Sequence, residues 1–172
     1  MQPMVRLLAF FVALMAAVSA QALSCRAPNA ARGFNFAMES VDKYHMVEIT
    51  FDQAGPDVPP VKIEDQAKPR EPVTHVYQTP ARLHQPRGPA ISRDITLTVE
   101  VTCLGMWCGS FPPQGNTLLM FAKVGARDEY HVRLGACPDD LVLYSPSAEQ
   151  IETLRTCWRE GACGPNALAQ FE

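Results

Sequence analysis

Residues 95–102 read Ile-Thr-Leu-Thr-Val-Glu-Val-Thr, and this strict alternation predicts a β-strand. Apolar side chains stand at the odd positions and polar side chains at the even ones, and most of the residues are β-branched, as is typical of strands. Because successive side chains of a strand point to opposite faces, one face of this strand is expected to be buried. The fold is therefore expected to be built around a sheet with one covered face.

Further strands are predicted on either side of this stretch. Residues 44–51 alternate in the same way, and residues 117–124 and 129–134 also have the composition of strands. The sequence between the last two, Gly-Ala-Arg-Asp at 125–128, is typical of a hairpin loop. We expect the strands at 95–102, 117–124 and 129–134 to follow one another in the sheet as a meander.

A helix is predicted near each end of the domain. Residues 28–43 carry apolar side chains at spacings of three and four, which favours a short N-terminal helix. Ser-Pro-Ser at 145–147 predicts the start of a C-terminal helix, since serine caps helix starts and proline is tolerated in the first turn. Ile151, Leu154 and Trp158 would form its apolar face. Its polar residues are expected to contact only water, and these are Glu152, Arg155 and Arg159.

The segment 54–90 is expected to form loops and edge strands. It carries eight of the 15 prolines of the chain, and proline cannot donate a hydrogen bond to a sheet. Short strands are predicted at 61–63 and 73–77, with an exposed turn at 66–71 between them.

Six cysteines follow the N-terminal region and predict three disulfides. Many pairings are open to six cysteines, but the short spacings favour Cys103 with Cys108 and Cys157 with Cys163. This leaves Cys25 with Cys137. Because that bridge would close the longest loop, it is expected to stabilise the fold most.

The first 22 residues have the layout of a cleaved signal peptide. Arg6 precedes the apolar run 7–18, and small residues occupy the end of 19–22. The apolar run is too short to span a bilayer, and no later run is long enough. The mature chain is therefore expected to be a single disulfide-stapled domain at residues 23–172, secreted or periplasmic, without an integral membrane segment.

Two other outcomes are open at this end of the chain. Cleavage after Ser24 also meets the requirement for small residues, and it would make Cys25 the first residue. Attachment of a lipid to Cys25 would anchor the chain, but Ala22 stands where a lipoprotein signal normally carries leucine.

Composition and motifs argue against several functional classes. With 15 basic and 18 acidic residues and no basic stripe, the chain lacks the features of a nucleic-acid-binding protein. The sequence contains no recognisable catalytic, phosphate-binding or dinucleotide-binding motif, so no enzyme activity and no cofactor are expected. The double acid at 139–140 is interpreted as a solvated turn. The chain has four histidines whose spacing is not that of metal ligands, and these are His45, His75, His84 and His131.

The order of these features resembles the tissue inhibitor of metalloproteinases and the netrin-like module. A cysteine follows the signal, several strands come next, Cys137 closes the last of them, and a serine-started helix follows. The strand at 117–124 and the segment 137–154 carry the most specific part of the likeness, which is one of pattern rather than identity. The resemblance implies a mainly β fold, a five- to six-stranded OB-like barrel with a short N-terminal helix and a C-terminal helix.

The N-terminus departs from that family. There the processed chain begins with Cys-x-Cys, and the first cysteine chelates the zinc of the target protease through its amino and carbonyl groups. Here Cys25 is followed by Arg26 and Ala27, and cleavage after Ala22 would leave two residues ahead of Cys25. Chelation would therefore require that Cys25 itself be the mature N-terminus.

The segment 103–108 is the other candidate for function. Its cysteines leave a strand, whereas redox pairs usually form Cys-x-x-Cys at a helix start, so a structural staple is favoured. If Met106 and Trp107 are exposed on the stapled loop, they would lose little entropy on contacting a partner.

Three functional hypotheses result. The leading one is an exported, non-enzymatic protein-binding or accessory module whose unknown protein partner contacts Cys25, Met106 and Trp107. The first alternative is a metalloprotease inhibitor acting through Cys25. The second is a thiol-disulfide protein using Cys103 and Cys108.

Overall fold

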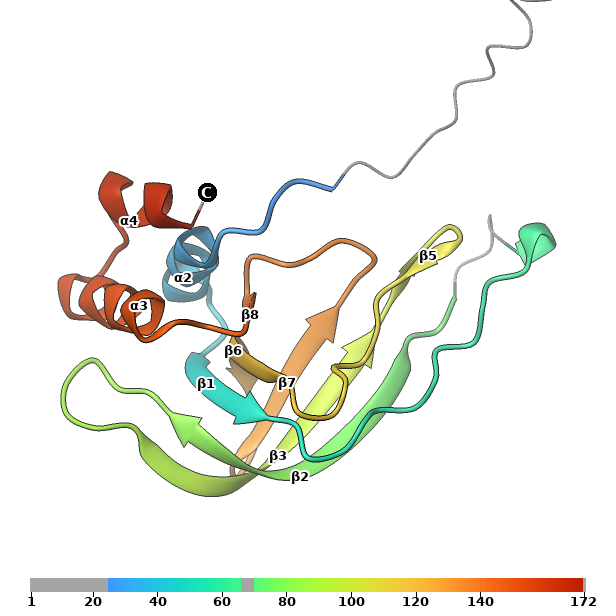
Figure 1. Cartoon of the computed structure of the whole chain (residues 1–172), viewed down its shortest axis with the longest axis horizontal. Helices are drawn as coiled ribbons and strands as arrows, with labels where there is room; N and C mark the ends of the chain where they lie inside the picture. Colours follow the sequence, from blue (N-terminus) through green and yellow to red (C-terminus); the bar gives the residue numbers. More distant parts are fainter. Residues whose placement is uncertain (1–24, 66–69, 172) are drawn as a thin grey trace, which may run out of the picture.

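Five strands close into a barrel in the computed structural model, which describes residues 25–65 and 70–171 (Figure 1). The strand order is β1-β2-β3-β7-β6, and β6 returns to β1. A sixth strand, β8, pairs with β6. These strands are β1 (Tyr44–Thr50), β2 (Val73–Leu83), β3 (Ile91–Val101), β6 (Thr117–Val124), β7 (Glu129–Leu134) and β8 (Val142–Tyr144). The expected OB-like barrel of five to six strands is thus confirmed, whereas the predicted signal peptide at 1–22 lies outside the described residues.

Strand β3 occupies the centre of the barrel wall. In its second part, the apolar side chains of Ile95, Leu97, Val99 and Val101 are at most 2% exposed, as the alternation in the sequence predicts. One edge of β3 pairs with β2 in antiparallel register, and the other pairs with β7 in parallel register. Every strand on this side of the barrel is therefore positioned through β3.

The expected meander is wrong. Strand β6 pairs with β1 along its length, from Tyr44 opposite Lys123 to Thr50 opposite Thr117, and it meets β7 only next to their shared turn. The chain between β3 and β6 crosses the barrel, so that β7 rather than β6 lies beside β3. Alternation shows which face of a strand is buried, but it carries no information about which strand lies beside it.

The proline-rich segment contains one long strand rather than two short ones. Residues 61–63 form no strand, and Ile63–Asp65 instead form the short 3-10 helix η1. Strand β2 continues to Leu83 and passes through Pro80. Proline is tolerated there because β1 pairs with β2 only at the last two residues of β2, which leaves the edge beside Pro80 open. Residues 66–69 of the predicted turn lie outside the described residues.

Three helices cover one end of the barrel, and the expected helices near the N-terminus and at the C-terminus are confirmed. Helix α2 (Ala30–Glu39) is shorter than the predicted segment, and the Asn29 side chain accepts hydrogen bonds from its first turn. Helix α3 (Ala148–Glu160) begins with a capping box between Ser147 and Gln150. A further short helix, α4 (Pro165–Gln170), was not expected from the sequence.

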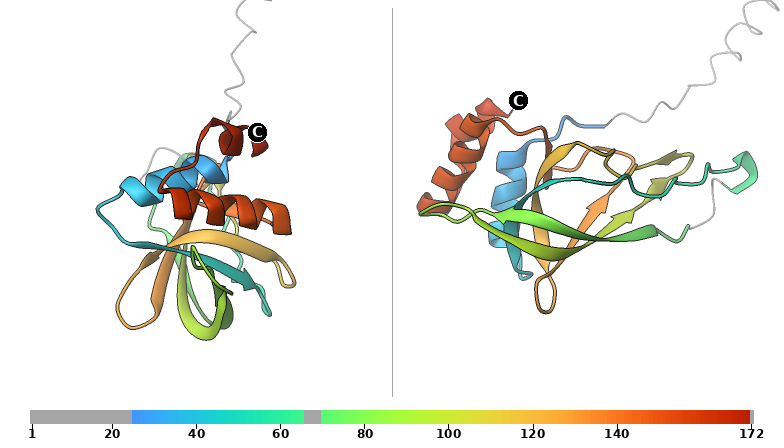
Figure 2. Two further views of the ribbon diagram at one scale, coloured as in Figure 1. Left: turned by 90° about the vertical axis from the view of Figure 1, so that its left-hand side faces the viewer. Right: turned by 60° about the horizontal axis from the view of Figure 1, so that its bottom comes forward.

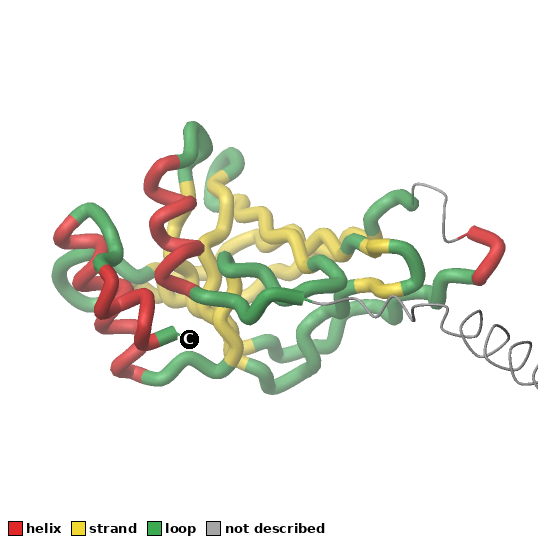
Figure 3. Tube along the Cα trace, turned by 90° about the horizontal axis from the view of Figure 1, so that it is seen from above, coloured by secondary structure: helices red, strands yellow, loops and turns green. Residues whose placement is uncertain are grey.

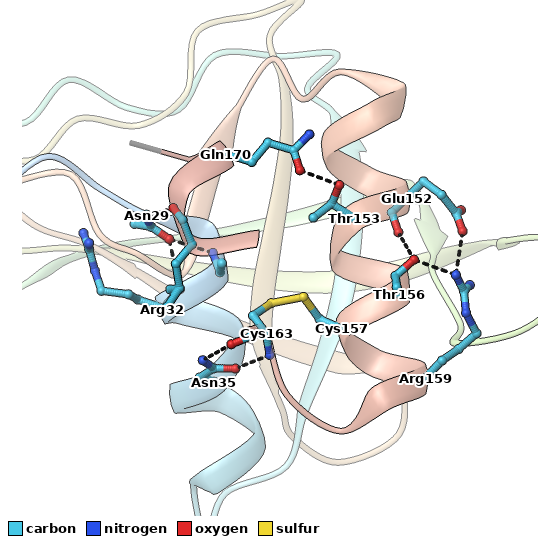
Figure 4. The surroundings of a disulfide bond; sticks show 12 residues. Asn29, Arg32, Asn35, Glu152, Thr153, Thr156, Cys157, Arg159, Cys163 and Gln170 are labelled. Atoms are coloured by element: carbon cyan, nitrogen blue, oxygen red, sulfur yellow. Dashed lines mark hydrogen bonds and ion pairs between the residues drawn. A yellow bond between two sulfur atoms is a disulfide. The ribbon is translucent and has the colours of Figure 1, made fainter. Parts of the chain in front are cut away.

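The helices pack on the barrel through a second apolar cluster. Phe34 of α2 meets Phe121 of β6 edge to face, and Leu154 and Cys157 of α3 are buried in the same cluster. Figure 4 shows the disulfide between Cys157 and Cys163 and the Asn35 side chain, which hydrogen-bonds to both backbone polar groups of Cys163. The end of α3 is therefore fixed to α2.

The polar side of α3 holds a barrel loop, so the expectation that it contacts only water is wrong. Arg155 donates hydrogen bonds to the carbonyls of Gln85 and Gly88, and Arg159 donates to the carbonyl of Pro86. Glu152 accepts from both arginines and so orients them toward the loop. The connection between β2 and β3 is thereby attached to the helices.

A short disulfide-linked hairpin lies at the end of the barrel opposite the helices (Figures 2 and 3). It consists of β4 (Cys103–Leu104) and β5 (Trp107–Cys108) and follows directly after β3. Cys103 is bonded to Cys108, and the third disulfide joins Cys25 to Cys137, which is the pairing favoured by the spacings. Three disulfides are typical of proteins that mature in an oxidising environment.

The disulfides Cys25–Cys137 and Cys103–Cys108 are expected to differ in their contribution to the stability of the fold. They close loops with sequence separations of 112 and 5 residues. The chain-entropy relation gives about 5 kcal/mol for the long loop and about 2 kcal/mol for the short one. Urea unfolding of a Cys25→Ser/Cys137→Ser variant should therefore show a clearly larger loss than unfolding of a Cys103→Ser/Cys108→Ser variant. Equal losses, or the reverse order, would contradict this prediction.

Candidate functional site

The hairpin β4–β5 presents apolar side chains to solvent. Leu104, Met106 and Trp107 are 60%, 52% and 40% exposed, although side chains of this kind are usually buried. Gly105 has a φ of +59°, which allows the tight turn between the two short strands. The hairpin is fixed at its base by the disulfide and by the pairing of β3 with its neighbours. It therefore forms a rigid apolar tip.

A groove of about 580 Å³ runs beside the hairpin. Residues 54–61 form one wall, and Met106 with residues 108–113 forms the other. Gly55 lies so close to the Phe111 ring and the Tyr77 hydroxyl that a Cβ atom would collide with both. The Tyr77 hydroxyl is buried and has no hydrogen-bond partner among the described residues, and burial raises its pKa. The groove is therefore tightly closed at its floor.

The Cys25–Cys137 disulfide lies near the hairpin β4–β5. A depression of about 170 Å³ is lined by 108–110, which begin with the last residue of the hairpin, and by 134–139, which include Cys137. Cys137 is the disulfide partner of Cys25. The two segments singled out in the sequence, the N-terminal cysteine and the hairpin, are therefore brought near one another.

Asp140 fastens the N-terminal arm to the barrel. Its carboxylate accepts a 2.6 Å hydrogen bond from the backbone N–H of Asn29 and forms ion pairs with Arg26 and Arg32. Burial opposes its ionisation, but these hydrogen bonds and charges outweigh it and hold the pKa of Asp140 below its ordinary value. The interpretation of 139–140 as a solvated turn is thus wrong for Asp140, whose side chain is only 18% exposed.

Arg70 contacts the hairpin disulfide, which sequence reasoning missed. One guanidinium nitrogen, Nη1, lies 3.8 Å from the Sγ atom of Cys103 and 3.9 Å from that of Cys108. Arg70 precedes the two cysteines by more than 30 residues and stands in a segment interpreted as an exposed turn. No spacing rule in the sequence could have indicated this contact.

The histidines occupy separate sites. His84 is buried with its Nε2 atom 2.7 Å from a carboxylate oxygen of Glu48, and burial lowers its pKa while the carboxylate opposes that shift. His45 has its Nδ1 atom 3.2 Å from the Tyr130 hydroxyl, and its pKa is also lowered, mainly by burial. Across residues 25–65 and 70–171, no three His, Cys, Asp or Glu side chains lie together as a metal site would need.

Comparison of the chain with protein-family models, curated proteins and solved structures gives no significant match. Of the helices in the described part of the chain, none is long and apolar enough to cross a membrane. What the chain does has to be inferred from its own residues.

The charge on Asp140 is expected to stabilise the fold in a pH-dependent way. Because the folded-state pKa is depressed, the contribution is complete above the ordinary value near 3.8 and is lost as pH falls through the folded value. Asp140→Asn should therefore lower the free energy of unfolding at pH 7 by about 1–2 kcal/mol. The difference from the wild type should shrink between pH 4 and pH 2.

Urea unfolding across this pH range measures the effect, and the neighbouring Asp139→Asn is the matched control. Asp139 accepts one local hydrogen bond, from the backbone of Leu141, which an asparagine side chain can also accept. A difference between wild type and Asp140→Asn that does not depend on pH would contradict this account of Asp140.

Proposed function

We propose that the chain is an exported, non-enzymatic protein-binding or accessory module that contacts a protein partner through the hairpin 103–108. The observation that carries this proposal is the group of three large apolar side chains exposed on one disulfide-linked turn, which comprises Leu104, Met106 and Trp107. Tryptophan is among the residues most enriched at the energetic centres of interfaces, and methionine is enriched at interfaces in general.

Two further features support this choice of surface. The hairpin is cross-linked at its base, so binding would order only side chains and not backbone, which lowers the entropic cost of association. The groove between 54–61 and 108–113 adjoins Met106 and offers a concave surface next to the protruding tip. A partner surface with a complementary apolar ridge would contact both.

The test compares two variants that each remove two exposed apolar side chains. Immobilised wild type, Met106→Ser/Trp107→Ser and Met38→Ser/Val41→Ser would be exposed to the exported protein fraction of the source cell. Met38 and Val41 are matched controls because they are also exposed but lie with α2 at the helical end. Captured proteins would be quantified by mass spectrometry.

We expect the wild type and the helical control to capture the same proteins. The hairpin variant should capture them at least 30-fold more weakly, since an interface centre contributes about 2 kcal/mol or more to the free energy of binding. Equal capture by both variants would contradict the proposal. So would a wild type that enriches no protein above the bare support.

The second candidate is a metalloprotease inhibitor acting through Cys25. The proximity of the Cys25–Cys137 disulfide to the hairpin favours it, because both border one depression and would face a single protease surface. Asp140 also holds Arg26 and Asn29, which would keep the residue after Cys25 in a fixed position. The absence of a Cys-x-Cys sequence weighs against it.

This candidate predicts that inhibition depends on where the chain begins. Two forms, one starting at Cys25 and one at Leu23, would be titrated against the catalytic domain of a secreted zinc endopeptidase. Only a free amino group on Cys25 could ligate the zinc, so only the first form should inhibit, and acetylation of its amino group should abolish the effect. Inhibition by both forms, or by neither, would contradict chelation by Cys25.

A further inference from the structure

The hairpin disulfide has the surroundings of a reactive rather than an inert bond. The Arg70 guanidinium lies within 4 Å of both sulfur atoms, and the sulfurs are in a partly exposed hairpin rather than in either core cluster. The other disulfides have different surroundings: Cys25 lies next to the carbonyl of Ala136, and the Cys157–Cys163 pair is buried. Among the described residues, the hairpin disulfide alone accepts hydrogen bonds from a cationic side chain.

A guanidinium in this position would favour the reduced state. When a disulfide is reduced, a cysteine sulfur leaves as a thiolate, and a nearby arginine lowers the free energy of that anion. Because Arg70 Nη1 is 3.8 Å and 3.9 Å from the two sulfurs, whichever sulfur departs would have the same counter-ion. Opposite unit charges about 4 Å apart attract enough, even in water, to change an equilibrium constant about fivefold.

We propose that Cys103 and Cys108 form a thiol-disulfide exchange site, with Arg70 as the counter-ion of the departing thiolate and an accessible dithiol of an exported polypeptide as the substrate. This activity goes beyond the proposed binding function, whose non-enzymatic part it would replace, and it gives a physical basis to the thiol-disulfide hypothesis. The exposed side chains of Leu104, Met106 and Trp107 flank the bond and are suited to apolar segments of a polypeptide whose own disulfides have not formed.

The exchange proceeds in two balanced steps. A substrate thiolate attacks one sulfur of Cys103–Cys108, a mixed disulfide forms, and the other cysteine leaves as a thiolate beside Arg70. The second substrate thiol then loses its proton and attacks the mixed disulfide, which releases the substrate as a disulfide. Two electrons and, after equilibration with solvent, two protons pass from the substrate to Cys103 and Cys108. The substrate is oxidised, and the hairpin is reduced.

The fold can accommodate the reduced hairpin. The loop closed by this disulfide is the shortest of the three, so reducing it returns the least entropy to the unfolded chain and destabilises the fold least. The barrel strands nearest to it are held by their own pairing, with β3 bonded to β2 on one side and β7 on the other. The barrel should therefore remain folded in both redox states.

The experiment measures the equilibrium between the hairpin disulfide and glutathione. The mature protein would be equilibrated at pH 7 and at pH 9.5 in buffers of graded reduced and oxidised glutathione, quenched with acid, alkylated and digested with trypsin. No lysine or arginine lies between Arg93 and Lys123, so one peptide carries both Cys103 and Cys108 and none of the other cysteines. The variants are Arg70→Gln and, as the matched control, Arg87→Gln, which removes an exposed arginine from the loop at the helical end.

At pH 9.5, where an ordinary cysteine thiol is ionised, the equilibrium constant for reduction should fall about fivefold in Arg70→Gln and stay at the wild-type value in Arg87→Gln. At pH 7 the reduced cysteines are mostly protonated, so the constants of both variants should stay close to that of the wild type. The difference at pH 9.5 should diminish in 1 M salt, which screens the interaction. Oxidation of a synthetic peptide with two cysteines should slow in the same variant, since the leaving thiolate is less stable. Unchanged equilibrium constants in Arg70→Gln at pH 9.5 would overturn the proposal. So would a wild-type Cys103–Cys108 disulfide that stays oxidised in every glutathione buffer in which Cys25–Cys137 stays oxidised.

The outcome can be separated from that of the binding proposal. The Met106→Ser/Trp107→Ser variant retains Arg70 and both cysteines, so its equilibrium constant should match the wild type even where capture of a partner is lost. Conversely, Arg70→Gln keeps the apolar tip. Failure of the exchange site would therefore appear in the glutathione equilibrium of Arg70→Gln. Failure of the binding surface would appear in the protein capture by Met106→Ser/Trp107→Ser.

Discussion

The two-sided pairing of β3 is the constraint on which the rest of this structure depends. Leu97 lies opposite Tyr77 of β2 and beside Tyr130 of β7, and all three side chains are fully buried. Burial of one whole face of β3 excludes a shift by one residue, because such a shift would turn every apolar side chain toward solvent. The barrel closes only because β7 joins β3 in parallel register and leaves β6 free to pair with β1.

The same strand places the candidate site. The hairpin follows β3 without an intervening loop, so its direction is fixed by the barrel wall (Figure 1). The helices lie at the opposite end with an apolar cluster of their own, built around Phe34 and Leu154. The molecule thus separates a densely packed helical end from an end where large apolar side chains face solvent. That separation is the physical reason for proposing a binding surface at the hairpin, and the Arg70 contact is the reason for proposing an exchange site there.

The sequence allowed the helices and strands themselves to be predicted better than the way in which the strands pair with one another. The alternation at 95–102 predicts the buried face, and the short cysteine spacings favour the observed disulfides. Strand partners were not predictable, because a parallel pairing between distant strands leaves no local pattern. The strand predicted at 73–77 stops short of Pro80, whereas β2 continues through Pro80 because its edge there is open. Arg70 was not identifiable at all, since it meets the cysteines only in three dimensions.

Hydrogen exchange combined with nuclear Overhauser contacts in solution would test the central claim, the closure of the barrel through β3, most directly. The structure predicts contacts between residues of 96–101 and their partners at 129–134, together with the slowest amide exchange in β3. It predicts no backbone-to-backbone contacts between β3 and 117–124, whose side chains meet those of β3 only inside the barrel. Backbone contacts of β3 with 117–124 in place of 129–134 would restore the meander. They would contradict both the barrel and the position assigned to the hairpin.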